Sequence, residues 1–217
     1  MLRESITNDW FTIALLIGLT AVVISKFLYV HRFSDFVSVL GNSKYLKIYA
    51  RNQKFIDGFD SLFFLNFIIS ISTFIYIGLA SFGQIERFDL NFFVKILFGV
   101  GVLTLSKILI ERLIGSLFDI DTIIDQYLFQ KTTYKNFSGL ILLPLNCILI
   151  YTLEPSKAVI YSIISLILLI NLVGFIISFK NHQKTLLANF FYFILYLCAL
   201  EIGPYLILTK LIIDFNA

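Results

Sequence analysis

The chain has 217 residues, of which 59% are hydrophobic and only 14% are charged. A soluble domain carries about 25% charged residues, so this composition excludes a soluble domain of useful size and predicts a membrane protein that crosses the bilayer several times. The net charge of +3 comes from basic and acidic residues scattered between apolar segments. Nucleic-acid binding needs a clustered basic face, and we therefore exclude nucleic acid as a partner.

The first apolar span runs roughly from Trp10 to Tyr29 and has an aromatic residue at each end, as expected at two membrane interfaces. Ahead of it, Arg3 is outweighed by Glu4 and Asp9, and no small-x-small cleavage site follows the apolar run. We therefore expect this span to be retained in the mature protein rather than cleaved as a signal peptide.

Five further apolar stretches follow, and an apolar helix of about 20 residues is enough to cross a bilayer. They run roughly from Ser61 to Phe82, Phe92 to Leu113, Phe137 to Leu153, Val159 to Phe179 and Leu186 to Ile213. The fourth of the six spans is short and is interrupted by Pro144. The two cysteines, Cys147 and Cys198, lie inside apolar segments and are expected to be reduced packing residues. The fold class is thus an all-α membrane bundle of six transmembrane helices, forming one domain over residues 1–217.

Lysine and arginine are distributed unevenly between the two sets of loops and span ends. Twelve lie on one side: Lys26, Arg32, Lys44, Lys47, Arg51, Lys54, Lys107, Arg112, Lys131, Lys135, Lys180 and Lys184. Five lie on the other: Arg3, Arg87, Lys95, Lys157 and Lys210. Because cytoplasmic loops carry the excess of basic residues, loops 31–60, 115–136 and 180–185 are predicted to be cytoplasmic and both termini to lie outside.

Two of the cytoplasmic connections are predicted to contain interfacial helical segments. Between His31 and Asp60, aromatic and aliphatic residues interleave with basic ones, a pattern typical of helices that lie flat at the headgroup level. This segment is either a connector attracted to anionic lipid or a docking surface for a cytoplasmic partner. Its basic residues are Arg32, Lys44, Lys47, Arg51 and Lys54. Ser116 to Gln130 is the second predicted surface helix, because its apolar residues recur at helical spacing.

Asp119, Asp121 and Asp125 lie off the apolar stripe of that second helix. Three aspartates near a membrane surface suggest a metal-diphosphate site, as in enzymes that act on lipid phosphates. Asp121 and Asp125 share a face at i, i+4, but Asp119 points elsewhere and no second acidic motif is present. The pattern therefore favours a solvated polar face over a metal site.

The third span is the most polar, with Lys95, Lys107 and Glu111. Snorkelling lets both lysines reach an interface, although Lys107 must bend against the N-terminal lean of helical side chains. Glu111, four residues on, is its obvious partner, and such a local pair is worth about 0.2–0.5 kcal/mol. We favour structural anchoring for these charges. Four asparagines are further expected to form interhelical hydrogen bonds worth about 0.6 kcal/mol each: Asn66, Asn146, Asn171 and Asn189.

The last span contains a carboxylate, Glu201, three residues before Pro204. An acid in a transmembrane helix costs roughly 2.5–3.5 kcal/mol, and the proline removes a helical hydrogen bond beside it. Glu201 is a buried structural acid bonded to Tyr205 or another helix, a proton or cation site at a broken helix as in transporters, or an outer interfacial residue. For the second alternative, the candidate proton or ion site consists of Glu201, Pro204, Lys107, Glu111 and Asn171.

The run FILYLCALEIGP, residues 193–204, resembles a family of Bacteroidota integral membrane proteins known only as a domain of unknown function. The resemblance extends over most of the chain, and LCALE-x-x-P is its specific part. Gly203 stands where a larger apolar residue is expected in that family. The resemblance implies the inner membrane of a Gram-negative envelope and implies no activity.

Three hypotheses for the function follow. The first is a non-enzymatic membrane subunit or scaffold that binds the bilayer and other envelope proteins through its helices and its basic-aromatic loop. It rests on the lack of a catalytic constellation, since the two histidines, His31 and His182, lie in loops and no phosphate-binding glycine loop occurs. We predict no catalytic residue, cofactor or metal. The second hypothesis is a small proton- or ion-coupled transporter using Glu201, and the third is a lipid-modifying membrane enzyme using the three aspartates.

Overall fold

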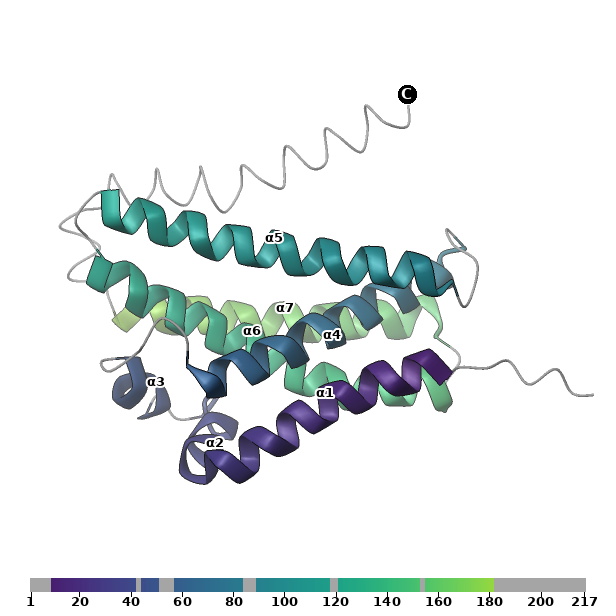
Figure 1. Cartoon of the computed structure of the whole chain (residues 1–217), viewed down its shortest axis with the longest axis horizontal. Helices are drawn as coiled ribbons and strands as arrows, with labels where there is room; N and C mark the ends of the chain where they lie inside the picture. Colours follow the sequence, from purple (N-terminus) through teal and green to yellow (C-terminus); the bar gives the residue numbers. More distant parts are fainter. Residues whose placement is uncertain are drawn as a thin grey trace, which may run out of the picture.

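The computed structural model describes residues 9–41, 44–50, 57–83, 89–117, 121–152 and 155–181, and in these ranges the chain forms helices and no strand. Figure 1 shows the helices as they lie in space. They are α1 (Asp9–Leu28), α2 (Val30–Val37), α3 (Lys44–Tyr49), α4 (Gly58–Ser81), α5 (Leu90–Leu117), α6 (Asp121–Tyr151) and α7 (Lys157–Asn181). The predicted all-α class is thus confirmed for the described residues.

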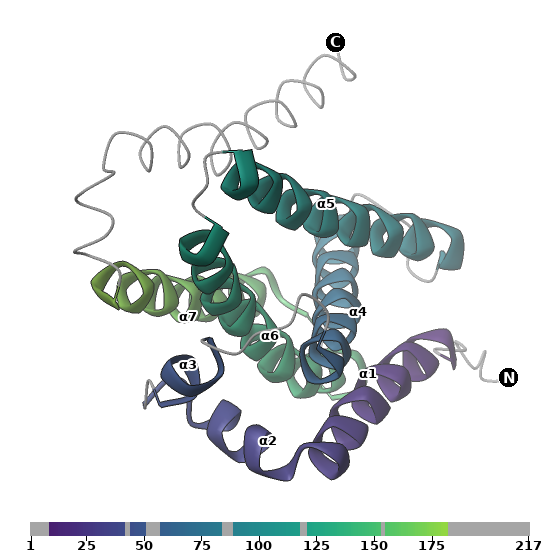
Figure 2. The ribbon, with the colours of Figure 1, turned by 60° about the vertical axis from the view of Figure 1, so that its left-hand side comes forward.

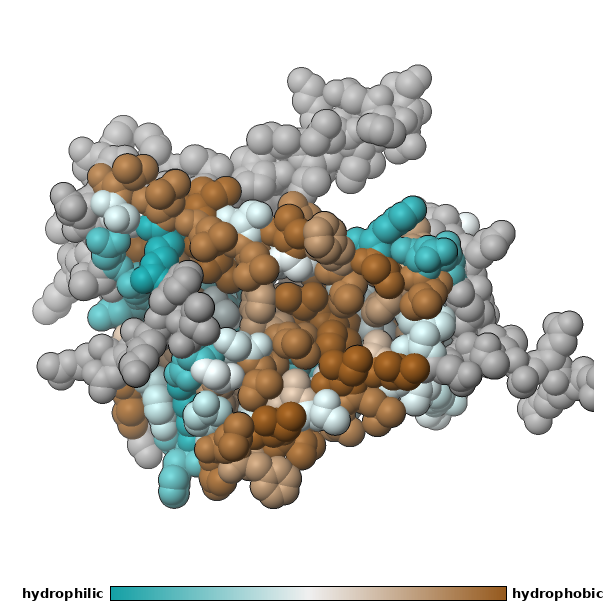
Figure 3. Space-filling view, in the orientation of Figure 1, coloured by the Kyte–Doolittle hydropathy of each residue, from teal (hydrophilic) through white to brown (hydrophobic). Residues whose placement is uncertain are grey.

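Five of these helices are long and apolar enough to cross a membrane, judged by length and composition. The candidate spans are Trp10–Leu28, Gly58–Ser81, Leu90–Leu117, Ile124–Tyr151 and Lys157–Ile177. In Figure 3, hydrophobic side chains cover the middle of the visible face and hydrophilic ones gather toward its two ends, the pattern that a bilayer requires. The helices therefore indicate a membrane protein. The predicted sixth span, Leu186 to Ile213, lies outside the described residues.

Helices α4 and α6 form the centre of the bundle. Helix α4 packs against α1, α5 and α6, and α6 also packs against α7. Figure 2 shows α1 and α5 on either side of α4, with α7 beyond α6. The short helices α2 and α3 lie at the end of the bundle where α1 ends and α4 begins, which we call the Arg32 end after the residue described below.

Helix α6 corrects two of the predictions. It runs unbroken from Asp121 through Pro144 to Tyr151, so Ser116 to Gln130 is not a separate surface helix and the fourth span is not short. The apolar stripe of residues 124–128 does exist, but Ile124 and Leu128 are buried in the bundle instead of facing a membrane surface. Pro144 is tolerated inside the helix because neighbouring groups in a membrane bundle can satisfy the carbonyl that it leaves without a donor.

Short helices α2 and α3 occupy the first predicted interfacial segment, and part of their apolar surface packs into the core of the bundle. Phe36 of α2 and Tyr45 and Leu46 of α3 are fully buried. They belong to one hydrophobic cluster with Phe59 and Phe63 of α4. The alternation of aromatic and basic residues in this loop therefore produces a cap that closes the Arg32 end of the bundle.

Glycines allow α6 to approach α4 and α7 closely. A Cβ atom at Gly139 of α6 would lie 2.6 Å from the backbone Cα of Phe67 in α4. A Cβ at Gly174 of α7 would lie 2.4 Å from the ring of Tyr134 in α6. Close approach through small residues is a main source of helix association in membranes, so these two contacts define the centre of the fold.

Candidate functional site

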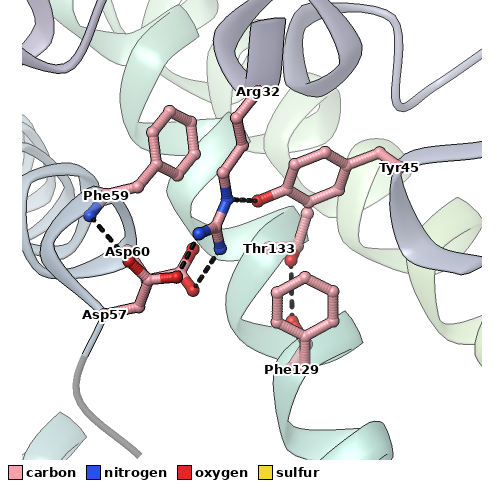
Figure 4. A network of polar contacts seen from close by, with 7 residues as sticks. All are labelled: Arg32, Tyr45, Asp57, Phe59, Asp60, Phe129 and Thr133. Atoms are coloured by element: carbon pink, nitrogen blue, oxygen red, sulfur yellow. Dashed lines mark hydrogen bonds and ion pairs between the residues drawn. The ribbon is translucent and has the colours of Figure 1, made fainter. Parts of the chain in front are cut away.

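An extended polar network is built around Arg32 of α2, at the Arg32 end of the bundle (Figure 4). Its guanidinium Nη1 donates to Asp57 Oδ2 and its Nη2 donates to Asp60 Oδ2 at 2.9 Å. Its Nε donates to the Tyr45 hydroxyl at 3.3 Å. The planar guanidinium presents several donors in a fixed geometry, and here it joins α2 to α3 and to the beginning of α4.

The two carboxylates are placed by the way in which α4 begins. Asp57 is the N-cap residue, and its Oδ1 accepts a hydrogen bond from the Phe59 backbone N–H at 3.3 Å. Aspartate is among the best N-cap residues because it satisfies a backbone donor that has no helical acceptor. Asp60 lies in the first turn, where a negative charge interacts favourably with the helix dipole. The helix start therefore presents two acids three residues apart to the same arginine.

Aromatic rings enclose the other sides of the guanidinium. The Arg32 Cζ lies 4.7 Å from the ring centroid of Phe59, 5.0 Å from that of Tyr49 and 5.9 Å from that of Tyr45. Cation–π contacts at such distances each contribute about 0.5–1 kcal/mol at exposed sites and more when water is excluded. The arginine side chain is only 12% exposed, so it is held rigidly between acids and rings.

The electrostatics of this network keep Arg32 charged and Tyr45 neutral. Burial alone lowers the pKa of Arg32, but the charge on Asp60 and the hydrogen bond to Asp57 outweigh burial and raise it above its usual value. Burial also raises the pKa of the Tyr45 phenol, and the charge on Asp60 adds to that rise. The network can therefore act as a fixed electrostatic latch. We define the Arg32 latch as Arg32, Tyr45, Asp57 and Asp60.

A second buried charge pair joins α5 to α6. The Oε1 atom of Glu111 accepts a hydrogen bond from Lys131 Nζ at 2.7 Å, and the Glu111 side chain is 1% exposed. The next residue of α5, Arg112, has its Nε 3.7 Å from Oδ1 of Asp125 on α6. The structure thus gives Glu111 a partner on the neighbouring helix, while the predicted pair with Lys107 on its own helix stays a prediction.

Asn146 and Asn171 form the predicted interhelical hydrogen bonds, whereas Asn66 accepts a hydrogen bond from Ser70 of its own helix and Asn189 lies outside the described residues. Asn146 Nδ2 of α6 donates to the backbone carbonyl of Ser70 in α4 at 2.8 Å. Asn171 Nδ2 of α7 donates to Ser138 Oγ of α6 at 3.2 Å, and it also reaches the carbonyl of Ile167 in its own helix at 2.8 Å. Both bonds involve α6, which agrees with its central position.

The family described as "Domain of unknown function (DUF4271)" matches residues 11–212, nearly the whole chain. The chain belongs to the DUF4271 family. No curated protein and no solved structure matches it. The resemblance to a membrane family of unknown function is thereby confirmed at the level of the family, while a Bacteroidota origin stays a prediction.

In this DUF4271 chain the predicted proton or ion site is only partly visible. Lys107 and Glu111 lie on α5 and Asn171 lies on α7, and Glu111 and Asn171 each bond to α6. Glu201 and Pro204 lie outside the described residues. The structure therefore shows Glu111 and Asn171 as links between helices and leaves their relation to Glu201 a prediction.

The residues of the predicted basic surface do not all lie in one exposed patch of the described structure. Arg32 is not part of an exposed patch, because it points into the latch. Lys44 and Lys47 belong to α3, while Arg51 and Lys54 lie outside the described residues. Of the three aspartates considered for a metal site, Asp119 also lies outside them and Asp125 is paired with Arg112.

Sequence reasoning missed the partners in the latch. A signal was present for Asp57 and Asp60, because an aspartate followed three residues later by a second acid, just before an apolar run, is typical of a helix N-terminus. No comparable local signal marks Arg32 as their partner, since it precedes them by 25 and 28 residues. Lys131 was counted only as a loop charge and not as a partner for Glu111.

Proposed function

We propose that this DUF4271 protein is a non-enzymatic, multi-pass inner-membrane protein that acts as a subunit or scaffold for other envelope proteins. The observation that carries the proposal is that buried charged side chains are paired with one another. Arg32 is neutralised by Asp57 and Asp60, and Glu111 pairs with Lys131. Removing one member of a buried ion pair typically costs about 3–5 kcal/mol, so these pairs are suited to hold the helices in fixed positions, as a framework requires.

The proposed topology has six spans, with Leu186 to Ile213 as the last one. The excess of lysine and arginine at the Arg32 end supports a cytoplasmic position for that end and periplasmic positions for both termini. The resemblance of residues 193–204 to Bacteroidota proteins supports a Gram-negative inner membrane.

Two surfaces are available for partners in this proposal. The first is the outer face of α5, where Phe98, Leu105 and Leu109 are exposed and Gly99 has no neighbour within 4 Å of an added Cβ. A small residue amid large apolar ones suits contact with lipid or with another transmembrane helix. The second is the cap formed by α2 and α3, which the Arg32 latch holds in a fixed position at the end of the bundle.

The proposal is tested by photo-crosslinking in native membranes. A photoreactive amino acid replaces the exposed Ile48 of α3, and crosslinked products are identified by mass spectrometry. A scaffold gives one discrete heteromeric product, and Arg32→Ala reduces it strongly by releasing the cap, while substitution of the exposed Lys26 leaves it unchanged. Recovery of only uncrosslinked monomer, from membranes and after mild extraction, would contradict the proposal.

A second candidate, the proton- or ion-coupled carrier, is favoured by one observation. The Oε2 atom of Glu111 is buried and has no hydrogen-bond partner among the described residues, so this carboxyl has an oxygen available to a proton. Flux in proteoliposomes that is abolished by Glu201→Gln and by Glu111→Gln would support the carrier. A proton or ion flux that both variants leave unaltered would rule out the carrier. No comparable observation favours the hypothesis of a lipid-modifying enzyme, because Asp125 is paired with Arg112.

A further inference from the structure

Deep inside the bundle, two asparagines from different helices are held by the same residue, Ser70. Ser70 Oγ donates a hydrogen bond to Oδ1 of Asn66 at 3.4 Å, one turn earlier on α4. The Ser70 backbone carbonyl accepts from Nδ2 of Asn146 on α6 at 2.8 Å. Asn66 and Asn146 are both fully buried. Both side-chain amides are thus fixed at the contact between α4 and α6.

In each of the two side-chain amides, one of the two polar atoms has no hydrogen-bond partner in the described part of the chain. Asn66 Nδ2 and Asn146 Oδ1 are buried and have no hydrogen-bond partner among the residues that the structure describes. An unpaired buried polar group costs about 1–3 kcal/mol, and native proteins pair more than about 90% of them. Two such groups beside one serine therefore require an explanation.

Rotating the amide groups does not remove the deficit. Exchanging oxygen and nitrogen in Asn146 would place its oxygen against the Ser70 carbonyl, and two acceptors repel each other. The same exchange in Asn66 would leave its oxygen unpaired in place of its nitrogen. At least one donor and one acceptor, or two acceptors, stay without a partner in every arrangement.

Helix α1 lies close to Asn66, and α6 carries Pro144 two residues before Asn146. Helix α1 passes so close that a Cβ at Gly18 would lie 3.1 Å from Asn66 Oδ1 and 3.4 Å from the side chain of Leu143 on α6. On α6, Pro144 has no N–H to donate to the carbonyl of Leu140. A backbone acceptor on α6 is therefore released about one and a half turns before Asn146.

We propose that a water molecule is bound between Asn66 and Asn146, at the junction of α1, α4 and α6. The free groups require a ligand that accepts from the Asn66 amide N–H and donates to the Asn146 amide oxygen, and water does both. In the arrangement that the structure shows, a metal cation does not fit because it cannot accept a hydrogen bond, and a carboxylate does not fit because it cannot donate one. Buried waters typically make about three hydrogen bonds to groups that would otherwise be unpaired, and the two amides supply two of these groups.

The proposed water site is independent of the scaffold proposal, because it concerns how the central helices are joined and not what the protein binds. The water joins α4 to the segment of α6 around the proline, where a helical hydrogen bond is missing.

Solid-state NMR of the protein in proteoliposomes tests the site directly. With 15N-labelled asparagine, magnetisation transferred from water should reach the Asn66 side-chain NH2, whose signal is assigned by its loss in Asn66→Leu. Asn171→Leu, which removes an amide already bonded to Ser138 and Ile167, should leave the water cross-peak in place. Asn146→Leu, which removes the acceptor, should abolish it.

Absence of a water cross-peak on the Asn66 amide in the unmodified protein would overturn the proposal, whether or not the variants fold. Persistence of the peak in a folded Asn146→Leu variant would overturn the bridge to Asn146.

Discussion

Helices α5 and α6 are both long, at 28 and 31 residues, and both have the composition of a membrane span. They occupy opposite positions in the bundle. The more apolar helix, α5, lies at the edge, with Phe98 73% exposed, whereas the more polar α6 lies in the middle with Thr133, Asn136, Ser138 and Asn146 all buried. Hydropathy thus indicates that a helix crosses the bilayer, and it does not indicate which helix is central.

The reason is that lipid provides no hydrophobic drive for helices to associate, so close packing and interhelical hydrogen bonds decide the arrangement. Helix α6 has both, through Gly139, Asn146 and its contact with Gly174. Helix α5 is attached by contacts that include one near each end. Phe93 packs 4.7 Å from the Trp10 ring near its beginning, and Glu111 bonds to Lys131 near its end.

The largest effect is expected from breaking the attachment of α5 to α6. Lys131→Ala leaves Glu111 buried without its partner, and removing one member of a buried ion pair typically costs about 3–5 kcal/mol. We expect a loss near 3 kcal/mol, because Lys131 is 17% exposed. Thermal unfolding in detergent measures it. Adding Glu111→Gln to Lys131→Ala should restore most of the loss, and no restoration would show that the charge pair is not its cause.

A smaller loss is expected from separating α6 from α4. In Gly139→Ala the added Cβ meets the backbone of Phe67, which cannot rotate away, and overpacking of this kind typically costs about 1–3 kcal/mol. Gly99→Ala on α5 is the matched control, since nothing lies within 4 Å of its added Cβ. It should be neutral or slightly stabilising, because alanine favours a helix over glycine by about 0.5–1 kcal/mol. Equal melting temperatures for the two variants would refute the assignment of α6 as the closely packed helix.

The smallest loss is expected at the contact between α6 and α7. In Gly174→Ala the added Cβ meets the ring of Tyr134, and a side chain can move where a backbone cannot. We expect a loss of about 1 kcal/mol, at the lower end of the overpacking range. A double-mutant cycle with Tyr134→Leu should show that the two substitutions are coupled, whereas additive effects would mean that α6 and α7 do not meet there.

Hydropathy and spacing in the sequence were enough to predict five of the spans, the short helices between His31 and Asp60, and interhelical hydrogen bonds from Asn146 and Asn171. They did not predict the continuity of α6. Its first half contains Gln130, Lys131 and Lys135, which resemble an interfacial surface until the helices that cover them are known. The burial of Arg32 could not be predicted from the neighbouring sequence either, because its acidic partners come from the start of the next span.

The central claim, a membrane bundle with α6 inside and α5 outside, is tested most directly by quenching of tryptophan fluorescence with brominated lipid. Trp10 is the only tryptophan in the chain, so Trp10→Phe provides a background free of signal. Phe98→Trp on α5 and Phe137→Trp on α6 then form a matched pair, because the first phenylalanine is exposed and the second is buried. Strong quenching of the tryptophan at position 98 with little at position 137 is the predicted result. Equal or reversed quenching, or no quenching at either position, would contradict this account.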